Sequence, residues 1–162
     1  MKIAIMRKDI IHNSSRPDNS TASVTVRHSV AFSHCDPAGI AFTGRIMDYA
    51  LEAIDEFWKV VLSGQGWYHL NMDHGIGTPF VNVQIDFHAP VTPRSDVETE
   101  VRVLRKGETS VTFELRGSQL EEQVFSGTVT CVFIIRGQRT AIQPPDWIAA
   151  PLQRFLPQGD RA

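Results

Sequence analysis

The chain has 162 residues, of which 42% are hydrophobic and 21% are charged, and these values are typical of one globular domain. Its formal net charge of −2 gives no bulk attraction to nucleic acid or to anionic lipid, so neither a nucleic-acid partner nor a membrane partner is predicted. The two cysteines, Cys35 and Cys131, lie far apart in no metal-type spacing, which predicts a reduced setting and no metal site. No segment has the length of a signal h-region or of a membrane helix, so a cytoplasmic location is predicted.

The start of the chain is polar. Residues 12–23 are rich in turn-forming types and show no hydrophobic period. We therefore predict a flexible N-terminal extension over residues 1–22 and a single domain over residues 23–162. A strand with one apolar face is expected next, from the alternating residues Val24, Val26, His28, Val30 and Phe32. A turn follows at residues 36–39, because proline fixes φ and glycine accepts the left-handed region.

One long helix is expected over residues 44–62. Its apolar positions recur at steps of three and four, with charged residues between them, and Gly64 and Gly66 end it. The apolar positions are Ile46, Ala50, Ala53, Ile54, Phe57, Trp58 and Val61. The mixed segment after the helix, residues 64–77, is glycine-rich and aromatic and is expected to rim a pocket.

After Pro79 the hydrophobic period changes to two. Four strands are expected, near residues 81–89, 97–103, 111–115 and 122–135, joined by short hairpins, with a short helix after Pro145. A strand, a long helix and a run of hairpin strands together predict an α+β fold, with an antiparallel sheet packed on one dominant helix.

The segment whose residues could carry out a reaction is the junction between the first strand and the long helix. Asp36 lies there, followed by the turn and then by a helix N-terminus, where free N–H groups and the positive end of the macrodipole favour a developing oxyanion. Thioester hydrolysis needs a nucleophile or base together with such donors, so Asp36 and the amides near residues 42–44 fit it. The pattern alone leaves a second interpretation open, in which Asp36 is a cap or turn residue.

These residues resemble a known family. The run His34–Ile40, Phe42, the helix end Glu56–Trp58 and the later Gly77–Pro79 resemble the 4-hydroxybenzoyl-CoA thioesterase family of hotdog-fold enzymes, over residues 24–142. The resemblance implies a hotdog thioesterase domain, in which an antiparallel sheet wraps around one long central helix. It also implies an acyl-CoA substrate, no cofactor, and homodimers that pair their sheets, hold the active sites at their interface and assemble into homotetramers.

The resemblance also assigns roles. It implies that Asp36 is the catalytic carboxylate, acting as nucleophile or as general base for water. It implies that the backbone amide of Thr43 polarises the thioester carbonyl. The residues implied to bind substrate are His34, Gly39, Phe42, Gly77 and Thr78. His34 has two open interpretations, since it either orients Asp36 or is a polar residue at a strand end. Arg105 and Lys106 are expected to hold the coenzyme A phosphates, with a solvated hairpin tip as the alternative.

Two departures from the family bear on the substrate. Thr43 occupies the position of a histidine in one branch, so a His-assisted version is not expected. Leu51 occupies the position where the hydroxybenzoyl branch has an acid, with Asp48 and Glu52 nearby, and an apolar residue there disfavours tight recognition of a 4-hydroxyl. Benzoyl, another aroyl, or a short to medium acyl group are equally open.

Other classes of function fit less well. The chain has no Gly-x-Ser-x-Gly elbow and no phosphate-binding glycine pattern, and Ala41 occupies the histidine position of the hotdog hydratases. The remaining alternative is a non-catalytic hotdog protein that binds acyl-CoA or serves as an assembly subunit. Loss of the acid would mark that class, and Asp36 is retained.

Overall fold

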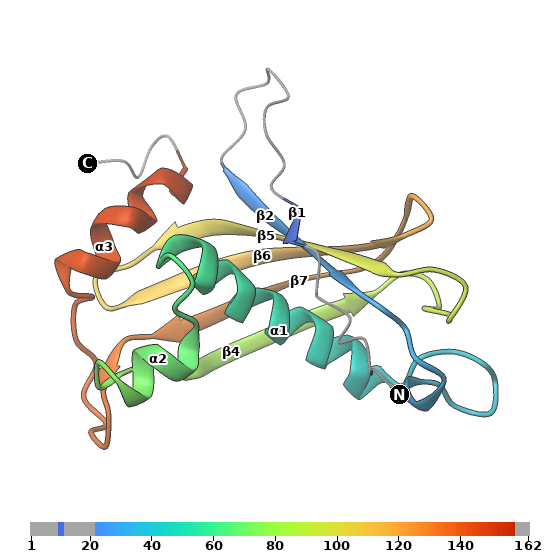
Figure 1. Cartoon of the computed structure of the whole chain (residues 1–162), viewed down its shortest axis with the longest axis horizontal. Helices are drawn as coiled ribbons and strands as arrows, with labels where there is room; N and C mark the ends of the chain where they lie inside the picture. Colours follow the sequence, from blue (N-terminus) through green and yellow to red (C-terminus); the bar gives the residue numbers. More distant parts are fainter. Residues whose placement is uncertain (1–9, 12–21, 158–162) are drawn as a thin grey trace, which may run out of the picture.

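The computed structural model describes residues 10–11 and 22–157, which form an α+β structure with a main antiparallel sheet and a long helix, as predicted (Figure 1). The strands are β1 (Ile10–Ile11), β2 (Ser23–His28), β3 (Ile76–Gly77), β4 (Phe80–Phe87), β5 (Val97–Lys106), β6 (Ser110–Gln119), β7 (Glu122–Val132) and β8 (Ile134–Ile135). The helices are α1 (Thr43–Val61), α2 (Trp67–Met72) and α3 (Asp146–Leu152), with 3₁₀ turns η1 (Phe32–His34) and η2 (Gln153–Phe155). No helix in these ranges is long and apolar enough to cross a membrane.

The six-stranded sheet has the order β1-β2-β5-β6-β7-β4, and β3 pairs with β8 in a separate small sheet. The expectation that successive strands pair throughout as hairpins is wrong for β4, which crosses the molecule to pair with β7 at the edge of the sheet. Its place beside β5 is taken by β2, in a register from Ser23 opposite Arg102 to His28 opposite Val97. The hydrophobic period identifies strands but carries no information on their partners.

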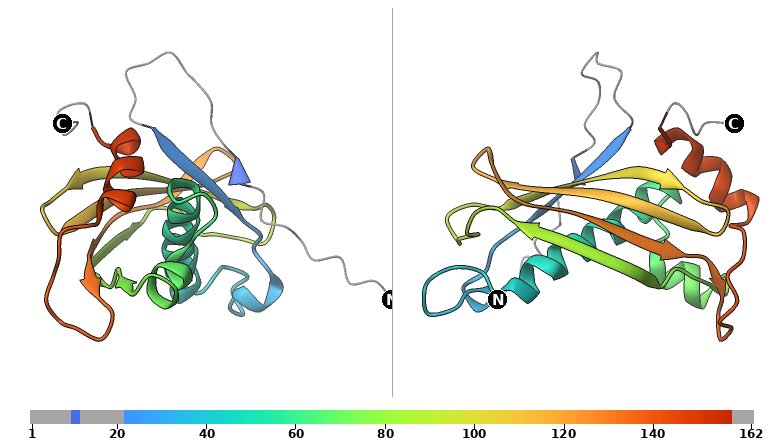
Figure 2. Two further views of the ribbon diagram at one scale, coloured as in Figure 1. Left: turned by 60° about the vertical axis from the view of Figure 1, so that its left-hand side comes forward. Right: turned by 180° about the vertical axis from the view of Figure 1, so that it is seen from behind.

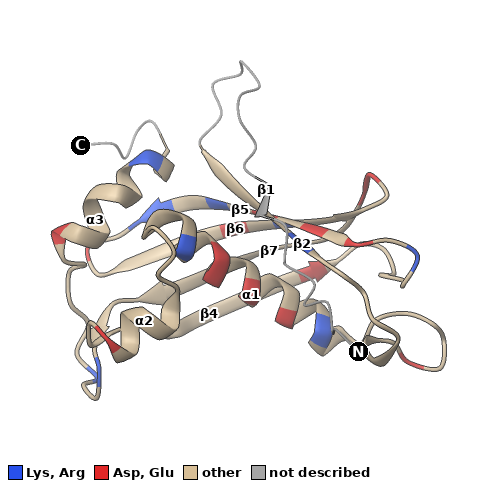
Figure 3. Ribbon diagram, in the orientation of Figure 1, with Lys and Arg blue, Asp and Glu red and all other residues tan. Residues whose placement is uncertain are grey.

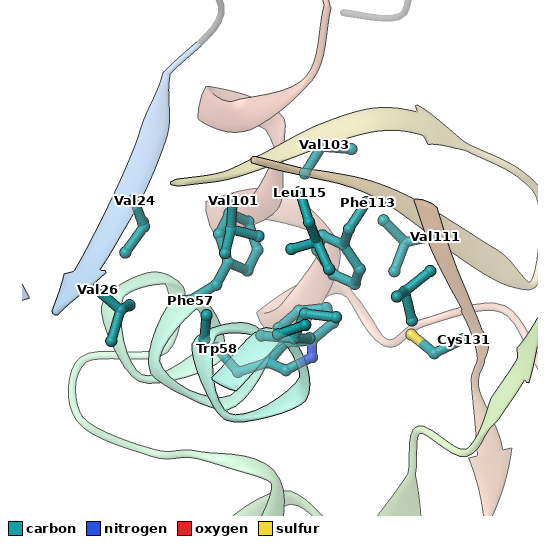
Figure 4. Packing of buried hydrophobic residues seen from close by; sticks show 14 of the residues in the cluster. Val24, Val26, Phe57, Trp58, Val101, Val103, Val111, Phe113, Leu115 and Cys131 are labelled. Atoms are coloured by element: carbon teal, nitrogen blue, oxygen red, sulfur yellow. The ribbon is translucent and has the colours of Figure 1, made fainter. Parts of the chain in front are cut away.

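Helix α1 lies in the concavity of the sheet, which curves around it (Figure 2). It begins and ends within one residue of its prediction, and its apolar stripe is buried. The aromatic centre of the core forms around Phe57 and Trp58, whose rings meet that of Phe113 edge to face at centroid distances of 5.1 and 5.8 Å (Figure 4). Sheet residues complete this core from the other side, among them Val24, Val26, Val101, Val111, Leu115 and Cys131.

The first predicted strand is too long. Val24, Val26 and His28 are buried as expected, but β2 ends at His28. Phe32 lies in the 3₁₀ turn η1 with 92% of its surface exposed, so its assignment to the buried face is wrong. The chain leaves the sheet after His28 to form the loop that precedes α1. Beyond that point, the two-residue alternation of apolar residues no longer predicts which side chains are buried.

Strand β4 differs from the expected strand with one buried face. Its large apolar residues are exposed on both faces, and its outer edge has no partner strand among the described residues. The exposed residues are Phe80, Val81, Val83 and Phe87. An unpaired edge strand of eight residues with four exposed large apolar side chains is a surface that proteins rarely leave open to water.

The predicted flexible extension, residues 1–22, lies mostly outside the described residues and stays a prediction. Within it, Ile10 and Ile11 form β1 and pair with Val26 and Thr25 of β2. The short helix expected after Pro145 is confirmed as α3, which begins at Asp146.

Gly127 allows β4 to pair closely with β7. It lies opposite Ile85, and a Cβ added at Gly127 would collide with the backbone oxygen of Gln84, which has little freedom to move within the ladder. We therefore expect Gly127→Ala to lower the free energy of unfolding by about 1–3 kcal/mol, measured by urea denaturation. Faster amide hydrogen exchange should be confined to β4 and its neighbour in β7. Unchanged exchange in β4 would contradict this account.

Candidate active site

Asp36 lies in a compact loop between η1 and α1. Cys35 and Ala41 form an isolated antiparallel bridge, and the Phe42 N–H donates to the His34 carbonyl at 2.9 Å, so the two arms of the loop run side by side. The Gly39 N–H donates to the Asp36 carbonyl at 2.9 Å, and Gly39 has a φ of 77°. The turn predicted at residues 36–39 is therefore confirmed, and its second arm leads directly into α1.

One of the two oxygens of the Asp36 carboxylate accepts hydrogen bonds from the loop. Its Oδ1 accepts the N–H of Ala38 at 2.8 Å and that of Ile40 at 3.4 Å. Its Oδ2 accepts no hydrogen bond from another described residue, and the side chain is half-buried. The residue thus has the turn role that the sequence left open, while one carboxylate oxygen remains available to a substrate or a water.

The first amides of α1 are free. Phe42 precedes the helix and caps it with no side-chain bond, and the first N–H groups that bond to its carbonyl are those of Arg45 and Ile46, at 2.8 and 3.3 Å. The N–H groups of Thr43 and Gly44 have no partner among the described residues. Both residues are exposed, so these two donors and the positive end of the helix dipole can face an oxyanion.

A cavity of about 460 Å³ lies between α1, α2 and the start of β4. Its lining is mainly apolar and comes from four parts of the chain: Leu51, Glu52, Ile54, Asp55 and Trp58 of α1, Trp67 and Asn71 of α2, Gly77, Thr78, Pro79 and Phe80 from β3 to the start of β4, and Ile134 of β8. Gly77 and Thr78, both predicted to bind substrate, line it, and so does Leu51. A Cβ added at Gly77 would lie 2.9 Å from Ile134, so glycine is needed where this wall closes.

Asp55 joins the two helices that bound the cavity. Its Oδ1 accepts the Trp67 N–H at 2.7 Å, at the start of α2, and its Oδ2 lies 2.9 Å from Lys59 Nζ. Lys59 also contacts Glu56 Oε1 at 2.9 Å. Burial alone would lower the pKa of Lys59, but its hydrogen bonds to Asp55 and Glu56 outweigh that effect and raise the pKa above its ordinary value. Acidic residues recur along α1 from Asp48 to Glu56 (Figure 3).

Sequence reasoning missed Asp55 and Asn71 as cavity residues. Asp55 lies one helical turn beyond Leu51, so the i, i+4 spacing was an available signal. Asn71 depends on how α2 packs, and no local pattern indicates that.

The structure does not bring all predicted site residues together within one chain. His34, Asp36, Gly39, Phe42 and Thr43 gather at the loop and the start of α1, whereas Gly77 and Thr78 line the cavity. Thr43 precedes Leu51 by two helical turns, which is about 12 Å along the axis. Arg105 and Lys106 lie at the end of β5 that is near α3, away from the Asp36 loop, and form no ion pair with another described residue (Figure 3).

Comparison with known proteins identifies the family. A sequence model described as the thioesterase-like superfamily matches residues 30–152, a span that contains the Asp36 loop and the cavity. The chain belongs to the thioesterase-like superfamily. Membership supports thioester hydrolysis as its general activity, and no curated protein was found to match.

Solved structures related to this superfamily member support the same fold. A thioesterase superfamily protein from Jannaschia sp. CCS1 is 40% identical, with a TM-score of 0.77 over 90% of this chain and 99% of that one. The 4-hydroxybenzoyl-CoA thioesterase from Pseudomonas sp. strain CBS-3 is 22% identical, with a TM-score of 0.67 over 78% and 97%. A 1,4-dihydroxy-2-naphthoyl-CoA thioesterase from Synechocystis is 17% identical, with a TM-score of 0.72 over 81% and 96%. The fold is therefore the hotdog fold, with the sheet wrapped around α1.

The two cysteines of this superfamily member should differ in reactivity. Burial raises the pKa of the Cys131 thiol to about 12, so almost no thiolate exists near neutral pH, whereas Cys35 is partly exposed beside Asp36. Iodoacetamide at pH 8 should alkylate Cys35 and spare Cys131, as read by mass spectrometry of tryptic peptides. Denaturant should expose both thiols. Equal labelling of both cysteines in the folded protein would contradict the buried placement of Cys131.

Proposed function

We propose that the protein is an acyl-CoA thioesterase that hydrolyses an aroyl-CoA, or a short to medium acyl-CoA, to the free acid and coenzyme A. The observation that carries the proposal is the pairing of a carboxylate with free amide donors. Asp36, with one oxygen unengaged, lies in the loop that leads into α1, where the amides of Thr43 and Gly44 have no partner among the described residues. Family membership supports the same chemistry.

The reaction needs few groups. The N–H of Thr43 polarises the thioester carbonyl and stabilises the tetrahedral oxyanion. Asp36 either attacks the carbonyl carbon, forming an anhydride that water then opens, or removes a proton from the water that attacks. In both routes the carbon–sulfur bond breaks, the thiolate leaves and takes up a proton, and the carboxylate of Asp36 is regenerated. No cofactor is required.

A homodimer formed through β4 would complete the site. Within one chain the cavity lies beyond the first turns of α1, next to the start of β4, while the Asp36 loop lies at the other end of that strand (Figure 1). A twofold axis that pairs two β4 strands antiparallel would bring the cavity end of one subunit to the loop end of the other. It would also cover the apolar edge of Phe80, Val81, Val83 and Phe87. We propose this dimer, its assembly into a homotetramer, and a cytoplasmic location.

The cavity favours a neutral acyl group. Its apolar surfaces include Leu51 and Trp58, and its charged side chains are the carboxylates of Glu52 and Asp55. An anionic acyl tail would therefore meet like charge, and Leu51 offers no partner to a ring hydroxyl. We infer a preference for benzoyl or apolar acyl groups over dicarboxylic ones. Arg105 and Lys106 remain the proposed contacts for the coenzyme A phosphates, reached from the partner across the dimer.

The test is a thiol-release assay with benzoyl-, 4-hydroxybenzoyl-, phenylacetyl-, straight-chain acyl- and succinyl-CoA. We expect turnover of the neutral thioesters and at least a tenfold lower kcat/KM for succinyl-CoA. Light scattering after gel filtration should give a mass that is a multiple of the dimer, and Val83→Asp should lower it together with activity. Binding of acyl-CoA without turnover of any thioester would overturn the proposal and favour the non-catalytic binding protein.

A further inference from the structure

A polar contact joins the second turn of α1 to the arm of the loop that carries Asp36. Tyr49, in the second turn of α1, is only 4% exposed, and its hydroxyl oxygen lies 2.7 Å from Nδ1 of His34. The same nitrogen lies 3.2 Å from the backbone nitrogen of Ala31. His34 is two residues before Asp36, so the contact reaches the arm from which the carboxylate extends.

These two contacts decide the protonation of the neutral ring. A backbone N–H can only donate, so Nδ1 of His34 accepts from Ala31 and carries no proton. The Tyr49 hydroxyl must then donate to Nδ1 as well, and the ring proton lies on Nε2. Burial, followed by the nearby Cys35 thiol, raises the pKa of Tyr49, which keeps the hydroxyl in its donor form.

The Tyr49 ring also packs against a residue of the sheet. It stacks on the ring of His28 at a centroid distance of 5.1 Å and an interplanar angle of 22°. His28 belongs to β2 and is buried, and its Nδ1 lies 3.7 Å from Glu52 Oε2 on the next turn of α1. The position of the Tyr49 hydroxyl is therefore determined by the helix and by the sheet together.

Residue 34 in turn positions both parts of the proposed catalytic pair. The His34 carbonyl accepts the Phe42 N–H at 2.9 Å, immediately before the free amide of Thr43. The next residue, Cys35, bridges Ala41, and Asp36 follows directly. A shift of His34 would therefore change the spacing between the Asp36 carboxylate and the helix amides.

We propose that Tyr49 is a positioning residue, which acts through the Nδ1 of His34 to set the distance between Asp36 and the first amides of α1. This inference rests on the proposed thioesterase function. Displacements of about 1 Å in such a pair lower the rate of the chemical step by as much as about a hundredfold without removing any reacting group. Tyr49 does not line the cavity and has no hydrogen bond to Asp36 among the described residues, so its hydrogen-bonded link to the loop runs through His34.

The test uses Tyr49→Phe, which removes the hydroxyl and keeps the ring stacked on His28. We expect kcat to fall about tenfold with KM changed less than twofold, because one hydrogen bond is lost and the substrate contacts remain. The same change in a His34→Ala background should have no further effect. Thr112→Val is the control with wild-type kinetics, because it removes a hydroxyl that contacts Thr130 at 2.9 Å on the sheet, away from the loop and the cavity.

Two conservative variants separate positioning from packing. Asparagine at position 34 places an acceptor near the location of Nδ1, whereas glutamine places its amide near that of Nε2. His34→Asn should keep most of kcat, and His34→Gln should be as slow as His34→Ala. The reverse order, or a Tyr49→Phe effect that persists in the His34→Ala background, would overturn the proposal.

A readout without substrate keeps this inference distinct from the proposed function. Amide hydrogen exchange over residues 34–44 should become faster in Tyr49→Phe and His34→Ala, while exchange over the rest of α1 stays at the wild-type rate. If the variants showed faster loop exchange but the protein hydrolysed no thioester, the proposed function would be overturned and the positioning role of the Tyr49–His34 contact would stand. Unchanged loop exchange in Tyr49→Phe would overturn the positioning role of Tyr49, whatever the activity.

Discussion

Asp36→Asn should lower kcat for the best acyl-CoA substrate by about 10²–10⁴-fold, which is the range expected for loss of a positioned base or nucleophile. The asparagine oxygen can still accept the N–H groups of Ala38 and Ile40, so the loop should keep its shape. The melting temperature and the affinity for acyl-CoA should therefore stay near the wild-type values. Thiol release, thermal unfolding and equilibrium binding measure the three quantities.

Asp96→Asn is the matched control for this prediction. Asp96 accepts the Ser29 hydroxyl at 3.0 Å, and asparagine preserves that acceptor while it removes the charge. Its kcat should equal that of the wild type. If Asp36→Asn lost activity only in proportion to a loss of folded protein, Asp36 would be a turn residue and not the catalytic carboxylate.

Trp58→Ala should lower the free energy of unfolding by about 3–5 kcal/mol, the largest expected loss of stability among the substitutions considered. The Trp58 side chain is 1% exposed, and its ring contacts those of Phe57, Phe113 and Phe133 edge to face. Their well-packed surroundings cannot collapse into the space that the indole leaves. Urea denaturation followed by circular dichroism gives the value.

Trp58 also lines the cavity between α1 and α2, so its loss should have a second effect. The variant should accept longer or bulkier acyl groups than the wild type, measured as a rise in their relative kcat/KM. Trp147→Ala provides the comparison, because Trp147 is exposed and its ring meets that of His74 at a tilt of 44°. That change should cost less than about 1 kcal/mol. Equal destabilisation by both changes would contradict the assignment of Trp58 to the core.

Much of the fold could be predicted because its signals are local. The stripe from Ile46 to Val61 and the glycines that follow it locate α1 within one residue. The Asp-Pro-Ala-Gly turn depends on proline and glycine conformations that neighbours hardly change. The resemblance then added the family and the hotdog fold. Its assignment of Gly77 and Thr78 to substrate binding stays a prediction, and both residues line the cavity.

The remainder depends on contacts between distant parts of the chain. Phe32 continues the alternation of β2, and only the departure of the backbone after His28 exposes it. Sequence reasoning did not single out Tyr49, because no spacing rule indicates that its hydroxyl meets a histidine fifteen residues earlier. The pairing of β4 with β7 is likewise decided by how the whole sheet closes around α1.

The sheet order also determines when the molecule can fold during synthesis. Strand β4 ends at Phe87, but its partner β7 is complete only when Val132 has been added, and ribosomes add about 5–20 residues per second. For several seconds the nascent chain therefore presents the apolar segment of β4 and the aromatic face of α1 with no sheet to receive them. Chaperones that bind emerging hydrophobic segments should meet this protein in that interval, and its yield should depend on them more than on its final stability.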